Sequence, residues 1–126
     1  MGSMVTLGKE TEKIIKKCDL NQSESKKLMD LAKKIGPLTD DTFGRVCAAI
    51  VLNTFPPERV AEWKDKIKNS RIPEEEKGRF GNLIRIANEI TSGNRIKPEW
   101  ESIVKKLRAK DSLFSESDSE RIMTKP

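Results

Sequence analysis

Histidine, the side chain that most often carries out acid–base catalysis, is absent from this chain. Its 126 residues include no histidine, two cysteines, and 20 aspartates and glutamates. Acid–base catalysis would therefore depend on carboxylates or lysines with shifted pKa values, yet no pair of acids lies on a buried apolar stripe. Glu74, Glu75 and Glu76 directly follow Pro73, where acidic residues stabilise the first turn of a helix. We therefore expect no catalytic residue and no enzymatic activity.

The two cysteines lack the neighbours that a metal site or a nucleophile needs. Cys18 and Cys47 do not form a CxxC pair, and no histidine is present to complete a zinc site or to act as a base. Each falls on the apolar stripe of a predicted helix, where a free cysteine packs as a small hydrophobic residue. Walker and dinucleotide-binding motifs are also missing. The sequence thus predicts two buried thiols, no metal site and no cofactor.

Basic side chains give the main indication of binding. Lysine and arginine number 25, and the formal net charge is +5, of which residues 1–109 contribute +6 and residues 110–126 contribute −1. Phosphate binding requires such cations to gather on one face, because the electrostatic gain grows with the number of phosphates neutralised together. A solvated surface is the alternative interpretation. The candidates for contact with nucleic acid or an acidic partner are Lys64, Lys68, Arg71, Lys77, Arg79, Arg95 and Lys97.

Aromatic side chains give little support to the binding of single strands. Bases stack on exposed rings, but four of the six rings fall at core positions of predicted helices. These four are Phe43, Trp63, Phe80 and Trp100. Phe55, which precedes Pro56, either staples the start of the next helix or lines a groove.

Helix-breaking residues divide the chain into six segments in which apolar residues recur every three or four positions. Two segments end near Cys18 and Ile35, with Asn21 or Ser23 capping the second. The third follows Thr39 and is apolar on nearly every side through Leu52, so the other helices should surround it. The last three begin at Pro56-Pro57, Pro73 and Pro98, since proline is tolerated in a first turn. Val60, Trp63 and Ile67 should form the buried side of the fourth.

The predicted fold is all-α, a compact bundle of about six short helices over residues 5–109. No internal repeat favours a stack of helical hairpins. Residues 1–4 read as a cloning remnant and a disordered start, and we expect a piece excised from a longer protein. Neither a signal peptide nor a membrane-spanning run is present, so we expect an intracellular protein, in cytoplasm or nucleus, with no membrane partner.

Residues 110–126 form a predicted disordered tail. Serines alternate there with aspartate and glutamate, and little apolar surface is available to bury. Ser115 and Ser117 are each followed by an acidic residue and are candidate phosphorylation sites for an acidophilic kinase.

One run resembles a nucleic-acid-binding motif. Gly78-Arg79-Phe80-Gly81 is similar to the GxxG loop of the KH domain, which grips the nucleic-acid backbone. The resemblance implies strands on both sides of the loop. Pro73 and Pro98 instead begin helical patterns there, so a helix is the favoured interpretation.

A second run resembles a peptide-binding domain. Phe43-Gly44-Arg45-Val46, preceded by Leu31, Ile35 and Leu38, is similar to the opening helical hairpin of the extraterminal domain of BET bromodomain proteins. That family binds peptides of chromatin regulators through an acidic strand. No such strand follows Ile50, and a generic helical hairpin is the favoured interpretation.

These observations predict a non-catalytic helical binding module, foremost a protein–protein adaptor within nucleic-acid-handling machinery. Direct RNA or DNA binding through a Lys/Arg patch is the first alternative, and it predicts a strong dependence on salt. Homo-oligomerisation through an exposed part of the third or fifth apolar stripe is the second.

Overall fold

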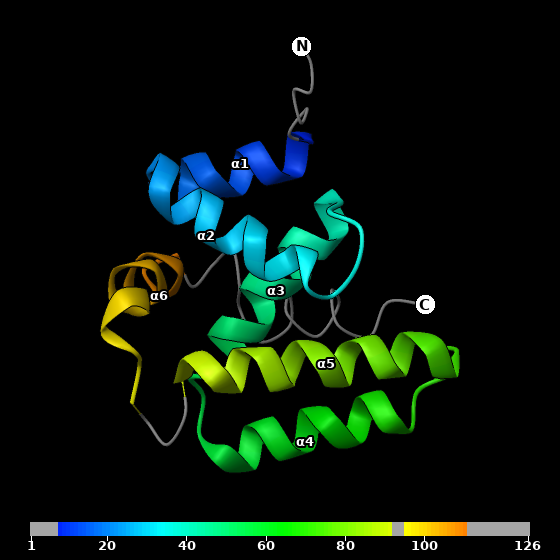
Figure 1. Ribbon diagram of the computed structural model, residues 1–126. Helices are drawn as coiled ribbons and strands as arrows, with labels where there is room; N and C mark the ends of the chain where they lie inside the picture. Colours follow the sequence, from blue (N-terminus) through cyan, green and yellow to red (C-terminus); the bar gives the residue numbers. More distant parts are fainter. Residues whose placement is uncertain (1–7, 92–94, 111–126) are drawn as a thin grey trace.

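The computed structural model describes residues 8–91 and 95–110, and these form an all-α bundle (Figure 1). The predicted fold class is confirmed, and the described residues contain no strand. One 3-10 turn, η2, precedes the last helix. The elements are α1 (Lys9–Lys17), α2 (Gln22–Lys33), α3 (Asp40–Leu52), α4 (Pro57–Lys68), α5 (Glu74–Thr91), η2 (Pro98–Trp100) and α6 (Glu101–Arg108).

Neighbouring residues fix where α2 and α3 begin. Asn21 Oδ1 accepts a hydrogen bond from Glu24 N at 2.8 Å, and Glu24 Oε1 accepts one from Asn21 N at 3.0 Å, a reciprocal capping box. Thr39 Oγ1 accepts from Thr42 N at 3.0 Å at the start of α3. Thr39 was the predicted cap of α3, and Asn21 is one of the two residues predicted to cap α2. Because each satisfies backbone N–H groups that the helix leaves unpaired, the boundary is set by a few neighbouring residues.

The first helix is capped from a distance instead. Gly8 occupies its N-cap position and has no side chain to offer. Asp40 Oδ1, from the first turn of α3, accepts hydrogen bonds from Thr11 N at 3.3 Å and from Thr11 Oγ1 at 2.8 Å. A Cβ atom on Gly8 would overlap the Asp40 carboxylate. Gly8 is therefore the residue that lets α3 cap α1.

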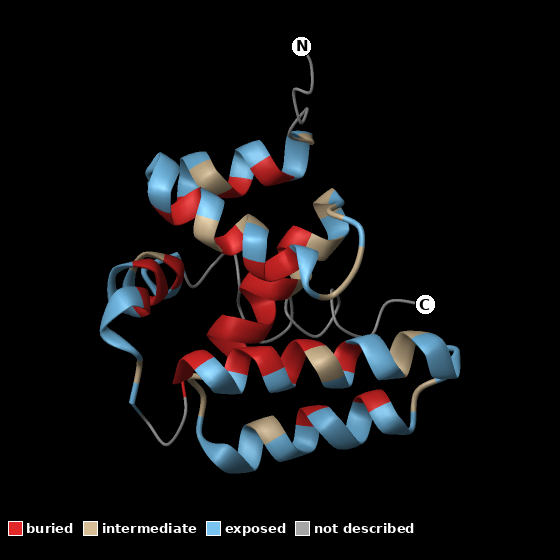
Figure 2. Cartoon of the chain, viewed as in Figure 1, coloured by how far each residue is buried: buried red, intermediate tan, exposed pale blue. Residues whose placement is uncertain are grey.

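Helix α3 is the centre of the core, as its apolar sequence predicted. It contacts α1, α2, α5 and α6, and Figure 2 shows it as an almost continuous red ribbon between them. Its buried residues include Phe43, Ile50 and Leu52. The homo-oligomerisation hypothesis relied on an exposed stripe along α3 or α5. In both helices the apolar stripe is buried within the bundle.

Helices α4 and α5 run antiparallel side by side, joined by residues 69–73 (Figure 1). Only Trp63 and Ile67 of α4 are buried. Val60, predicted to be buried with them, is only partly covered, because α5 flanks α4 on one side and Val60 faces a hollow between the two helices. Helix α4 is therefore attached to the bundle by few side chains.

Some of the remaining sequence predictions concern described residues, and others lie outside them. Gly78 and Gly81 lie inside α5, so the run that resembles a KH loop is helical. No helix in the described part of the chain is long and apolar enough to cross a membrane. The predicted remnant at residues 1–4, the predicted tail from residue 111 onward, and both candidate phosphorylation sites lie outside the described residues.

Candidate functional site

A groove of about 360 Å³ lies between α4 and α5. Its floor is apolar, formed by Ile67 of α4 with Phe80 and Ile84 of α5, all of them buried. These residues are in the groove because the buried stripes of two antiparallel helices meet along one line. We call this part of the α4–α5 groove the first well.

A second hollow, of about 340 Å³, continues the groove toward the start of α4. Phe55 and Val60 supply its apolar lining, and Lys64 and Asn88 line both hollows. At the far end, Asn53 Nδ2 donates a hydrogen bond to Thr91 Oγ1. We call this second hollow the second well. The two wells share Lys64 and Asn88 at their boundary, and together they form the α4–α5 groove.

The rim of the first well is basic. Four cationic side chains line it against the single carboxylate of Glu74. The four are Lys64, Lys68, Lys77 and Arg85. Lys77 is partly engaged, since its Nζ donates to Lys68 O at 2.8 Å and lies 3.6 Å from Glu74 Oε1. Lys64 and Lys68 are exposed on the α4 side of the groove. The positive potential that would attract an acidic ligand is therefore on that side.

Gly81 contributes no side chain to the α5 side of the first well. It lies in the interior of α5, where glycine costs about 0.5–1 kcal/mol relative to alanine. No packing contact within the described residues explains it, because a Cβ added there would meet nothing within 4 Å. Gly81 therefore leaves open space at the mouth of the groove.

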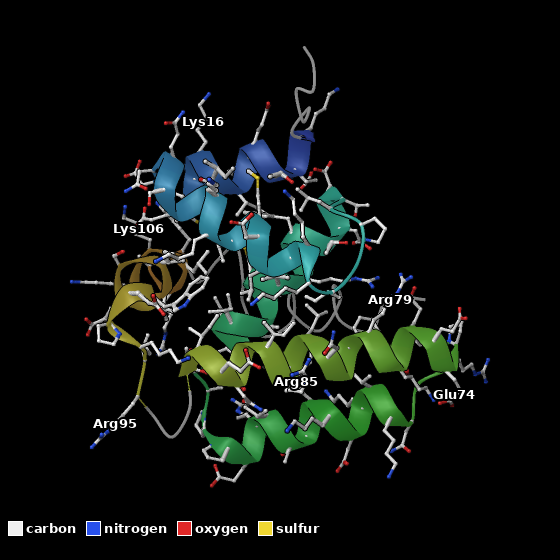
Figure 3. The ribbon with its side chains drawn as sticks, in the orientation of Figure 1. Lys16, Glu74, Arg79, Arg85, Arg95 and Lys106 are labelled. Atoms are coloured by element: carbon white, nitrogen blue, oxygen red, sulfur yellow. The ribbon has the colours of Figure 1, made fainter. Side chains whose placement is uncertain are left out.

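The structure brings together three of the seven predicted cationic residues. Lys64, Lys68 and Lys77 line the first well. Arg71 lies in the connection between α4 and α5, and Arg95 and Lys97 lie just before η2. Figure 3 shows Arg95 directed outward at the end of the bundle opposite Glu74, and Arg79 on the side of α5 away from α4. The seven residues do not form one continuous patch.

Arg79 lines a different and smaller hollow, of about 170 Å³, between α5 and the segment before α3. The principal cation there is Arg45, which pairs with Asp41 at 3.1 Å and with Glu76 at 3.0 Å. Its guanidinium also lies 4.8 Å from the centre of the Phe80 ring. The contacts with Glu76 and Phe80 hold α3 against α5, and the pair with Asp41 lies within α3, so Arg45 serves the fold and leaves little charge for a ligand.

Sequence reasoning missed Arg85 and left the role of Phe55 open. Arg85 lies four residues after Gly81 and eight after Lys77, a spacing that places all three on one side of a helix and could have revealed it. Phe55 lines the second well, one of its two predicted roles. The other four aromatic residues predicted for the core are buried, with Trp100 the most exposed at 9%.

Neither cysteine contributes to this groove. Both are free and buried, as predicted. Burial raises the pKa of the Cys18 thiol, an effect that nearby Lys110 partly offsets, and it raises the pKa of the Cys47 thiol well above its ordinary value. Within the described ranges, no group of three or more histidine, cysteine, aspartate or glutamate residues is placed to hold a metal ion.

Comparison with known proteins identifies no relative. No family model, no curated protein and no solved structure matches the chain. The functional argument therefore depends on the geometry of the α4–α5 groove.

Proposed function

We propose that this chain is a non-catalytic protein-binding module, and that the α4–α5 groove receives an apolar segment of a partner protein. The observation that carries the proposal is the two-well trough itself, with Ile67, Phe80 and Ile84 beneath the first well and Phe55 and Val60 beside the second. Concave apolar sites with a few polar groups at the rim are the usual form of ligand-binding surfaces. An adaptor needs such a surface and no catalytic group.

Direct RNA or DNA binding is the competing proposal, and the basic rim supports it. Four of the five charged side chains around the first well are cations. The rings of Phe80 and Trp63, however, are almost wholly buried and offer no stacking face. Phe55 and Val60 of the second well are only partly buried, and this apolar lining suits apolar side chains better than phosphates, so we favour a protein partner.

A peptide library displayed on phage and selected on the folded protein tests the proposal. Enriched peptides should perturb the NMR amide signals of Lys64, Ile67 and Gly81, and Gly81→Leu should abolish binding by filling the first well. Gly78→Leu is the matched control, because Gly78 is in the same helix but does not line the groove. Peptides that bind elsewhere, or equally to both variants, would refute the proposal.

The same protein should be titrated with an RNA and a DNA oligonucleotide over a range of salt concentrations. A phosphate binder loses affinity linearly on a log–log plot of affinity against salt, whereas apolar burial responds weakly. Tight, steeply salt-dependent oligonucleotide binding without any groove-directed peptide would favour the competing proposal.

A further inference from the structure

We infer that the occupant of the α4–α5 groove is an acidic amphipathic helix of a partner protein, with two apolar residues seven positions apart and a carboxylate between them. This inference rests on the proposed function and specifies its ligand. It is argued from the spacing of the wells, from the backbone of the walls and from the charge of the rim.

The spacing of the wells selects a helix. Val60 beside the second well and Ile67 in the first are seven residues apart on α4, which places the wells about 10 Å apart along its axis. Two side chains seven residues apart on a partner helix have the same separation and the same face. In an extended peptide, residues on one face are about 7 or 13 Å apart, so they fill one well and miss the other.

The walls of the groove lead to the same conclusion. Both are helices, α4 and α5, whose backbone groups are paired within each helix. The walls therefore offer no open sheet edge for main-chain hydrogen bonds, which is how extended peptides gain affinity. A helix brings its own backbone already satisfied and presents only side chains.

The positive charge of the rim indicates that the partner helix is negatively charged. Lys64, exposed on α4, lies between the two wells, opposite Asn88 on α5. A partner residue three or four positions after the first apolar anchor projects at that level. Glutamate or aspartate there would meet Lys64 and Asn88, and a further acidic residue near the first anchor would meet Lys68. Arg85 is already paired with Glu89 at 3.4 Å and contributes less to this recognition.

Three designed peptides test the spacing and the charge of the inferred ligand. The first is a helix-forming peptide with leucines seven positions apart and glutamates three and four positions after the first leucine. In the second, of identical composition, the leucines are five positions apart and lie on different faces. In the third, lysines replace the glutamates. Fluorescence anisotropy should show at least tenfold weaker binding of the second and third peptides than of the first.

A charge exchange then separates the specific contact from general attraction. Lys64→Glu should weaken binding of the first peptide about tenfold and strengthen binding of the third, while Lys105→Glu, a change of the same charge on α6 away from the groove, should do neither. Circular dichroism confirms that both variants remain folded.

Two further ligands represent other occupants. One is the peptide of residues 111–126 of this chain, and the other is a second copy of the protein, detected by light scattering over a range of concentrations. The inference would be overturned if one of these two ligands bound more tightly than the first peptide and if Gly81→Leu abolished that binding. So would equal affinity of the first two peptides. If library peptides still map to the groove in that case, the proposed function stands and the helical ligand alone is wrong. If no peptide of any kind enters the groove, both fail.

Discussion

Lys106 Nζ donates a hydrogen bond to Glu24 Oε1 over 2.7 Å and so joins α6 to α2. The same carboxylate accepts hydrogen bonds from Asn21 N at 3.0 Å and from Ser102 Oγ at 2.8 Å. The side chain of Glu24 is only 9% exposed. Because its charge is largely removed from water, the three donors together determine whether the arrangement stabilises the fold.

Removal of the Lys106 charge should therefore destabilise the protein. Lys106→Met keeps most of the aliphatic length but leaves Glu24 with one donor fewer, and we expect the free energy of unfolding to fall by about 1–3 kcal/mol. Urea denaturation at neutral pH measures the change. Lys105→Met is the control, since Lys105 is the exposed neighbour on the same helix. Equal stability of the two variants would show that the Glu24 cluster contributes nothing.

The same cluster predicts how stability depends on pH. Burial raises the pKa of Glu24, but hydrogen bonds from Lys106, Asn21 and Ser102 outweigh it and hold the pKa below its ordinary value. A carboxyl with a lowered pKa stabilises the fold fully above the unfolded-state value, about 4.3, and the stabilisation is lost as pH falls through the folded-state pKa.

Glu24→Gln removes this titration, so the variant should lose less stability than the wild type when the pH is lowered below about 4. Urea denaturation across that pH range gives, for each protein, the slope of the free energy of unfolding against pH. Glu101→Gln, a change of the same type at an exposed residue outside the Glu24 cluster, is measured beside it. If the free energy of unfolding fell with pH equally in the wild type and in Glu24→Gln, the prediction would be contradicted.

Two glycine-to-alanine substitutions should act in opposite directions. Gly8→Ala places a methyl group against the Asp40 carboxylate that caps α1, and loss of that cap should cost about 1–2 kcal/mol. Gly78→Ala adds a methyl group to a helix interior where nothing lies within 4 Å, and it should stabilise by about 0.5–1 kcal/mol. Thermal melts of the two variants beside the wild type would reveal the contrast. A neutral Gly8→Ala would mean that α1 does not need Asp40.

The cysteines should be inert while the protein is folded. The thiolate is the reactive form, and burial raises the pKa of both thiols, that of Cys47 most strongly. A chromogenic disulfide reagent should therefore react slowly with the native protein, at a rate limited by unfolding, and rapidly with both thiols in denaturant. Fast labelling of Cys47 in native buffer would show that α3 opens readily.

The sequence was sufficient for features that short segments determine. Asn21 and Thr39 are capping residues whose partners lie three residues away, so their helix starts could be predicted. The central position of α3 could also be predicted, because a helix with apolar residues on nearly every side has to be enclosed.

Features that depend on how helices rotate against each other could not be predicted in this way. Asp40 caps a helix whose Thr11 is 29 residues away. Val60 continues the apolar pattern of α4 but faces the groove, because α5 flanks α4 on one side only. Most of the seven candidate cations lie near the ends of predicted helices or in loops. Their dispersal, like the grouping of Lys64 with Arg85, depends on the antiparallel pairing of α4 and α5.

The enclosure of α3 has a consequence for biosynthesis. Synthesis proceeds from the N-terminus, so Phe43 to Leu52 leave the ribosome well before Phe80 of α5 and Leu107 of α6, two of the residues that complete the core around them. Of the four described helices that contact α3, two have been synthesised during that interval, α1 and α2, so part of the apolar surface of α3 is still uncovered. Chaperones that capture exposed apolar segments would find their strongest target in this chain before translation reaches its last helix.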